Sequence, residues 1–205
     1  TEGAAEQALD VSEVEYVELE PLFDPVEAAK PDATVLHPDL LSYKGLPVPV
    51  EKLGNVFAYL KWGKGDVVAG FKQADVIVEN TFTTQVTHQS YLEPHACVVK
   101  ADSSGGAEVW ACSKTPFAVR TQLSNCIGVA KEKLVFHPVH IGGDFGGKGG
   151  FMDVPACYFL SLKSGQPVKM VMDYSEELVA GNPRHPSIIK VKTGVKKNGL
   201  IVAHH

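Results

Sequence analysis

A loop rich in glycine, residues 142–150, is the part of this 205-residue chain best suited to holding a ligand. It runs Gly-Gly-Asp-Phe-Gly-Gly-Lys-Gly-Gly and follows an apolar stretch, residues 134–141, that is typical of a strand. Glycine permits positive φ angles and close approach of the backbone to a ligand, and successive N–H groups can converge on an anion. The sequence therefore predicts a bare backbone surface for a group that is negative or rich in oxygen, with the Phe145 ring pushed outward to wall a substrate pocket.

Two other interpretations of this loop stay open. Residues 142–148 fit the nucleotide-binding pattern G-x-x-x-x-G-K, but Gly149 replaces the Ser or Thr that holds magnesium. A helix that began near Lys148 would place Pro155 about two turns in, where proline costs about 3 kcal/mol, whereas a helix with Asp153 as its N-cap avoids this cost. A dense glycine loop can also be a plain tight connection between two elements.

Composition and charge limit the functions open to the whole chain. With 44% hydrophobic residues, the chain can bury a sizeable core. The net charge of −5 and the lack of a basic stripe argue against nucleic-acid binding. No apolar run approaches the length of about 20 residues that spans a bilayer, so we expect a soluble protein with no membrane partner. The four cysteines, Cys97, Cys112, Cys126 and Cys157, lack zinc or iron–sulfur spacing and are expected to be buried free thiols, which favours the cytoplasm.

Sequence patterns predict an α+β chain. Helices are expected near the N-terminus and over residues 25–29, 66–74, 116–126, 153–163 and 175–180. Strands are expected over residues 14–19, 75–84, 96–101, 107–113, 134–141, 168–172 and 188–195, with turns at 103–106 and 196–199. Prolines make residues 21–55 loop-like. The patterns at both ends also suggest that the native polypeptide is longer.

The histidines do not predict a metal site. His137 and His140 are three residues apart, a spacing that puts them on opposite faces of a strand. Cysteine and carboxylate partners at ligand spacing are lacking as well, so no protein ligand to a metal is predicted.

Several segments together resemble the xanthine dehydrogenase and aldehyde oxidase family, the molybdenum hydroxylases. Residues 142–148 resemble the G-G-G-F-G-G-K loop of that family. Further resemblances follow in family order and cover nearly the whole chain, at residues 11–21, 90–95, 113–129, 166–169 and 184–186. This combination is much more specific than any one of its motifs.

The resemblance implies a domain organisation and a reaction. Residues 1–40 are expected to be the end of an α/β hammerhead domain, residues 41–55 a linker, and residues 56–205 the first part of a molybdopterin-binding domain. The implied cofactor is molybdopterin or its cytosine dinucleotide form, which carries the chemistry while the protein positions it. FAD and [2Fe-2S] are expected on partner subunits or domains. The implied reaction oxidises a small molecule, an aldehyde or an N-heterocycle, with water as the oxygen source.

The resemblance also implies roles for individual residues. Gly142, Gly143, Phe145 and Gly146 are expected to bind the cofactor. Phe145 and Gly146 are the expected catalytic residues beside the reacting atoms, and the Phe145 ring lies along the substrate. Gln89 is a second expected substrate contact. The loop N–H groups would act electrostatically, because they are already oriented toward developing negative charge.

The chain departs from the family pattern at three positions. Asp144 replaces the third glycine of the loop, so its carboxylate must point away from an anionic cofactor or be paired. Gly149 replaces a glutamate that xanthine-oxidising members use to hold purines, which weighs against a purine substrate. Thr87 stands where many members place a glutamine near molybdenum, and Gln85 and Gln89 are the candidates to take over that role.

No general base is assigned in this chain. The family's catalytic glutamate lies near the end of the large subunit, beyond His205, with the remaining part of that subunit and most of the pterin contacts. Neither Glu93 nor Glu176 is assigned as the general base. Glu93 is instead expected to pair with a buried donor. A folded but non-catalytic piece, or a degenerate homologue, therefore stays open as an alternative function.

Overall fold

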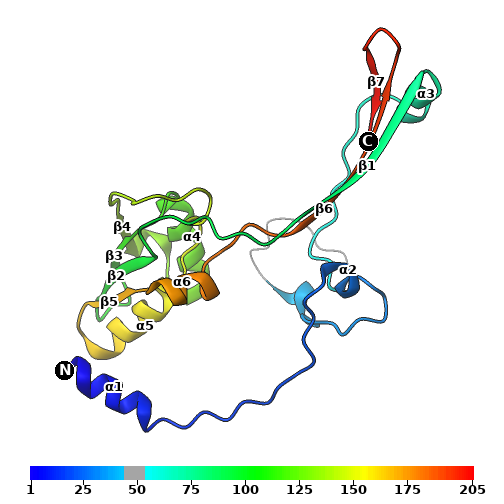
Figure 1. Cartoon of the computed structure of the whole chain (residues 1–205). Coiled ribbons are helices and arrows are strands. Elements are labelled where there is room, and N and C mark those ends of the chain that lie inside the picture. The colour runs from blue at the N-terminus through cyan, green and yellow to red at the C-terminus, as the bar shows by residue number, and fades with distance from the viewer. Residues whose placement is uncertain (44–53) are drawn as a thin grey trace. The chain divides into compact units, whose positions relative to one another are not determined.

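The computed structural model describes residues 1–43 and 54–205, which divide into two compact units, Thr1–Gly63 and Lys64–His205 (Figure 1). Most of the linker expected over residues 41–55 lies outside the described residues.

The first unit contains only short elements. These are α1 (Glu2–Asp10), α2 (Pro25–Ala28) and the 3-10 turn η1 (Leu40–Ser42). The Asp24 carboxylate caps α2, since it accepts the N–H of Val26 at 2.7 Å. The strand predicted over residues 14–19 is wrong, because the segment is irregular and pairs with no strand among the described residues. Its apolar side chains, such as Tyr16, are exposed.

The second unit holds all the strands of the described chain. Its elements are α3 (Val67–Lys72), β1 (Val76–Thr84), β2 (Ala96–Ala101), β3 (Ala107–Ala111), α4 (Pro116–Ile127), the 3-10 turn η2 (Lys131–Lys133), β4 (Leu134–His137), α5 (Val154–Ser164), β5 (Val168–Val171), α6 (Tyr174–Ala180), β6 (Ser187–Val195) and β7 (Ile201–His204). The mixture of helices and strands agrees with the predicted α+β class, and most boundaries lie within a few residues of those expected.

A four-stranded sheet in the order β4-β3-β2-β5 carries the core of this unit (Figure 1). β2 and β3 form the predicted antiparallel hairpin, whereas β3 and β4 are parallel and are joined through α4. α4 and α5 contribute to one core with the sheet, and glycines with φ of 72° and 68°, Gly128 and Gly165, end these two helices. The buried core residues are Cys97, Val99, Ala107, Val109, Leu123, Leu134, Val154, Cys157 and Tyr158.

Three local expectations fail for identifiable reasons. β4 ends at His137 rather than residue 141, because Pro138 has no N–H to continue the ladder. His140 is therefore outside the strand, and its predicted face no longer applies. Thr115 stands at the N-cap position of α4, where its hydroxyl donates to the Gly149 carbonyl at 3.1 Å. All four cysteines are free, but Cys126 is exposed rather than buried.

A second, three-stranded sheet has the order β1-β6-β7. β1 pairs antiparallel with β6 along its whole length, and the predicted turn at residues 196–199 joins β6 to β7. An isolated bridge between Thr87 and Arg184 lies just outside β1 and β6. It ties the segment after β1 to the segment before β6, which is where two parts of the candidate site come together.

Candidate functional site

The glycine loop lies directly against the ring of Tyr91, a fully buried residue. A Cβ atom at Gly147 would come within 2.5 Å of the Tyr91 ring carbon Cε1, closer than real Cβ contacts allow. At Gly143 a Cβ would lie 3.1 Å from the Tyr91 Cβ, and φ there is 98°. Glycine is thus required at these positions by close packing and by backbone conformation.

Glu93 fixes both ends of the loop. Its Oε2 atom accepts the N–H of Gly142 at 2.8 Å and the ammonium of Lys148 at 2.6 Å. Lys148 is fully buried, and its Nζ atom lies 4.7 Å from the centre of the Tyr91 ring, where a cation is attracted to the aromatic face. Burial alone would raise the pKa of Glu93, but the bonds from Lys148 and Gly142 lower it. The expected pairing of Glu93 with a buried donor is confirmed.

Glu177 holds Tyr91 from the opposite end of its side chain. The Tyr91 hydroxyl donates to Glu177, which also accepts the backbone N–H of His95 at 2.7 Å and lies 2.8 Å from His95 Nδ1. Burial alone would raise the pKa of Glu177, but these hydrogen bonds lower it. Burial and the carboxylate together raise the pKa of Tyr91. A fully buried carboxylate is therefore kept ionised by a complete set of partners.

Sequence reasoning missed Glu177. A usable signal was the Asp173-x-x-Glu176 capping box at the start of α6. The Glu176 side chain bonds back to the Asp173 N–H in this motif, so the adjacent Glu177 is the carboxylate left for another partner. Gly181 is a second signal, since a Cβ there would lie 2.3 Å from the Glu177 carbonyl oxygen and 2.7 Å from Glu177 Oε1. The small residue makes room for the buried carboxylate.

Between its two fixed ends, the loop presents bare backbone and an aromatic ring. The Phe145 side chain is 64% exposed, and its φ of 45° is uncommon for a residue other than glycine. The N–H groups of Gly143, Asp144 and Phe145 have no acceptor in the described part of the chain. A Cβ at Gly146 would meet nothing within 4 Å, so this side of the backbone is open to a ligand.

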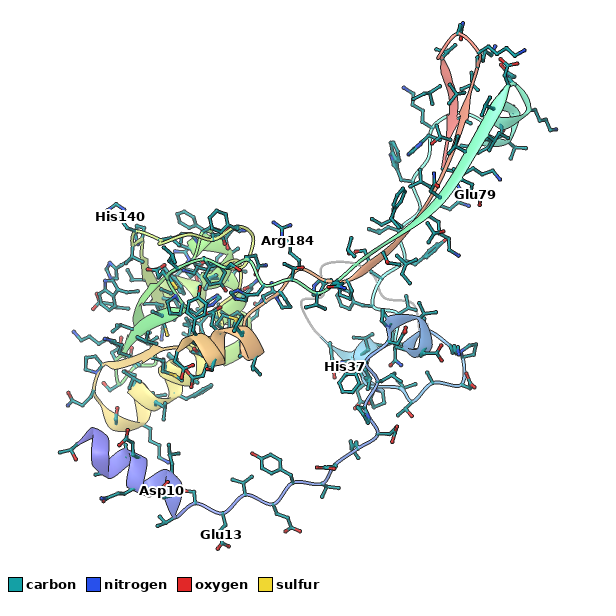
Figure 2. All side chains as sticks on the ribbon, in the orientation of Figure 1. Asp10, Glu13, His37, Glu79, His140 and Arg184 are labelled. Atoms are coloured by element: carbon teal, nitrogen blue, oxygen red, sulfur yellow. The ribbon has the colours of Figure 1, made fainter. Side chains whose placement is uncertain are left out.

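The candidate cofactor residues differ in whether their N–H groups are available. The Gly142 N–H is bonded to Glu93, and the Gly146 N–H donates to Asp144 Oδ2 at 2.9 Å. Donation from either residue to a ligand would require an internal bond to break, whereas Gly143 and Phe145 are free to donate. The carbonyl of Phe145 is bonded as well, because the guanidinium of Arg184 donates to it at 3.1 Å. Arg184 is labelled in Figure 2.

Gln89 is brought to the loop, and Gln85 is not. The Gln89 side chain donates to the Asn182 carbonyl at 2.9 Å. Its Oε1 atom is buried without a partner in the described chain and lies 3.2 Å from where a Cβ of Gly147 would stand. Gln85 is exposed. Of the two glutamines considered in the sequence, Gln89 is therefore the one placed beside the loop, with an acceptor to offer.

The geometry gives no support to a nucleotide P-loop. Lys148 is buried and bonded to Glu93, so its ammonium does not point at a bound phosphate. α5 begins only at Val154, whereas a P-loop helix starts near the lysine. Among the residues described, no three His, Cys, Asp or Glu side chains are grouped to hold a metal ion. No helix in the described ranges is long and apolar enough to cross a membrane.

Comparison with known proteins adds a decisive match. A sequence model described as the molybdopterin cofactor-binding domain matches residues 50–205. This chain belongs to the molybdopterin cofactor-binding domain family. The predicted resemblance to the molybdenum hydroxylases is thereby confirmed.

Individual relatives of this family agree with that assignment. The chain is 33% identical over its whole length to a probable xanthine dehydrogenase subunit of Bacillus subtilis, covering 26% of that protein. It is 30% identical over 99% of its length to the nicotinate dehydrogenase large molybdopterin subunit of Eubacterium barkeri, covering 44% of it. The chain thus spans less than half of either relative.

A solved member of the family shares the fold. The CO dehydrogenase from Oligotropha carboxidovorans matches 98% of this chain with a TM-score of 0.82 and 29% sequence identity, and the match covers 26% of that chain. The aldehyde oxidoreductase from Desulfovibrio gigas matches with a TM-score of 0.81, but at 22% identity it supports the fold alone.

Proposed function

We propose that this chain is part of the molybdenum-cofactor-binding subunit of a hydroxylase that oxidises an aldehyde or an N-heterocycle with water as the oxygen source. Each turnover would form one carbon–oxygen bond and release two protons and two electrons. The observation that carries the proposal is the loop itself, in which three successive free N–H groups lie next to an exposed aromatic ring. Tyr91 and Glu93 hold this loop without help from a ligand.

The loop fits a molybdenum cofactor by the chemistry of its donors. Such a group presents oxygen atoms and negative charge, and the free N–H groups of Gly143, Asp144 and Phe145 can donate to them. The open backbone at Gly146 permits close approach. When bound, the cofactor supplies the two-electron redox chemistry and the oxygen that derives from water. Gly142 would contribute by fixing the start of the loop through Glu93.

The chain's own residues would position the reactants. The exposed Phe145 ring would lie along the substrate and exclude water, and the fixed N–H groups would stabilise charge that develops on an oxygen. Gln89 would contact the substrate beside the loop through its side-chain amide, once its buried Oε1 atom is uncovered. Gly149 has no side chain to hold a purine, so we place the substrate among aldehydes and other N-heterocycles.

The remaining parts of the enzyme follow from this assignment. Residues 1–40 would end a hammerhead domain, residues 41–55 would link it onward, and residues 56–205 would begin the cofactor-binding domain. The rest of the large subunit would supply the general base and most pterin contacts. FAD and [2Fe-2S] partners would take the electrons. The free thiols support a cytoplasmic location for such a complex.

A Phe145→Ala variant of the full enzyme tests the proposal. We expect turnover of benzaldehyde or quinoline, measured with a dye acceptor, to fall about 10- to 100-fold because a misplaced substrate reacts slowly. Molybdenum content and melting temperature should stay unchanged, since the ring is exposed. Unchanged turnover of every substrate that the parent enzyme accepts would contradict the role of the ring.

A further inference from the structure

Asp144 satisfies the loop's own N–H groups from within. Its Oδ2 atom accepts the N–H of Gly146 at 2.9 Å, and its Oδ1 atom accepts the N–H of Lys148 at 2.6 Å. Its backbone carbonyl also accepts the N–H of Gly147 at 2.8 Å. One residue therefore occupies three donors in the second half of the loop. Backbone N–H groups that donate to a carboxylate form strong, charge-assisted hydrogen bonds.

Lys114 completes this arrangement from a separate segment, between β3 and α4. Its ammonium lies 2.9 Å from Asp144 Oδ2. Burial alone would raise the pKa of Asp144, but the N–H of Gly146 and the Lys114 ammonium lower it, so the side chain is charged at neutral pH. Asp144 adds a negative charge that a glycine at this position would not carry. The Lys114 ammonium neutralises that charge.

These contacts bear on Phe145 because they fix its neighbours. Phe145 stands between Asp144 and Gly146, and its carbonyl is bonded to Arg184. Its positive φ is a strained conformation that persists only when the surroundings over-determine it. The Asp144–Gly146 bond spans Phe145, which makes Asp144 the closest side chain able to impose that conformation. A glycine at position 144 would leave Gly146 and Lys148 without this acceptor.

We propose that Asp144, held by Lys114, is a positioning residue that sets the conformation of Phe145 and of the free N–H groups before any ligand is bound. Its effect on turnover rests on the proposed function, whereas its effect on the loop does not. The Asp144 carboxylate accepts the N–H groups of Gly146 and Lys148, which a bound anion could otherwise accept. It therefore orders the second half of the loop without a ligand. The N–H groups of Gly143, Asp144 and Phe145, in the first half, keep their capacity to donate to a ligand.

Hydrogen exchange measured by mass spectrometry on the full enzyme, purified without its cofactor, tests the structural part. Asp144→Ala should speed exchange of the peptide 142–150 about 10- to 100-fold, the value of one or two hydrogen bonds to a charged group. Lys114→Met should give a smaller increase, and Asp144→Asn, which keeps one acceptor, should lie between Asp144→Ala and the parent. Unchanged exchange in Asp144→Ala would overturn the proposal, whether or not the enzyme turns over any substrate.

Asp102 provides a matched control. Its carboxylate accepts the N–H of Ser104 at 2.7 Å and of Gly106 at 3.1 Å, in the β2–β3 turn. Asp102→Ala therefore makes the same chemical change in a turn of the same kind outside the glycine loop. It should speed exchange only in its own turn. Faster exchange of peptide 142–150 in this control would mean that the loop merely reports general loosening, and would overturn the assignment.

Kinetics of the cofactor-loaded enzyme test the positioning part. For benzaldehyde or quinoline, Asp144→Ala should lower kcat about 10-fold or more at unchanged molybdenum content, with Asp144→Asn recovering part of the loss. The electron paramagnetic resonance spectrum of the partly reduced enzyme should also shift, which mere loss of stability would not cause. An unchanged kcat and spectrum alongside faster exchange would overturn the link between Asp144 and catalysis. Enzyme that lacks molybdenum altogether would count against the proposed function and leave the exchange result standing.

Discussion

At the scale of single residues, two carboxylates, Glu93 and Glu177, hold the loop and the tyrosine beneath it. Glu93 ties the start of the loop to its end through Gly142 and Lys148, and Glu177 holds Tyr91 beneath it. The sequence indicated that Glu93 pairs with a donor, because it lies between apolar and rigid neighbours. It could not name Lys148 as the donor, since the two residues meet only after residues 91–93 pack under the loop.

The Glu93–Lys148 pair is expected to contribute strongly to stability. Glu93→Gln leaves a fully buried ammonium without its counter-charge. Because the Glu93 side chain is itself 34% exposed, we expect the free energy of unfolding to fall by about 1–3 kcal/mol. Urea denaturation of the full-length protein measures this. The exposed pair of Glu79 and Lys192, in the second sheet, is the control (Figure 2), and Glu79→Gln should cost less than about 1 kcal/mol. Equal losses of unfolding free energy in Glu93→Gln and Glu79→Gln would contradict a special role for the Glu93–Lys148 pair.

Glu177 should make stability depend on pH in the acid range. Its pKa is lowered in the folded protein, so its stabilisation is present above the ordinary carboxyl pKa of about 4.3 and is lost as the pH falls through the lowered value. Glu177→Gln should therefore lower stability at pH 7 and flatten the decline of unfolding free energy between about pH 5 and pH 3. Glu176→Gln, at an exposed position on the same helix, should keep the parental slope. A parental slope in Glu177→Gln would show that the carboxylate is not kept ionised.

At the scale of elements, what the sequence reveals depends on whether a signal is local. Caps and turns placed α4 and α5 correctly, because Pro116 and Gly128 act on the backbone next to them. The strand predicted over residues 14–19 failed because alternation shows only that a strand could form, and pairing needs a partner. The loop was recognisable from its glycines. Its contact with Tyr91 was not, because it joins segments more than fifty residues apart.

The packing of the loop on Tyr91 predicts a difference between two glycines of the same element. Gly147→Ala places a Cβ 2.5 Å from the Tyr91 ring and should displace the loop, lowering both molybdenum content and turnover by about 10-fold or more. Gly149→Ala meets only Lys114 Cε at 3.7 Å, an ordinary contact, and should be tolerated. Metal analysis and steady-state assays of the full enzyme compare them. Tolerance of Gly147→Ala would mean that Tyr91 does not fix the loop.

At the scale of the whole molecule, this chain spans only part of the relatives that it matches. It spans 26% of the Bacillus subtilis relative and 44% of the Eubacterium barkeri relative. The described residues build a loop with free donors and an exposed ring, held from behind by buried charges. The loop residues name neither a general base nor a single substrate, because they offer backbone N–H groups and one aromatic ring, which many small molecules can contact.

The most direct test is the molybdenum content of the full-length protein, purified from its native source with its co-purifying chains identified. Elemental mass spectrometry should find close to one molybdenum per large subunit, accompanied by flavin and iron–sulfur chains. A full-length subunit with an intact loop but without molybdenum would contradict the account. It would instead indicate a folded, non-catalytic relative of the hydroxylases.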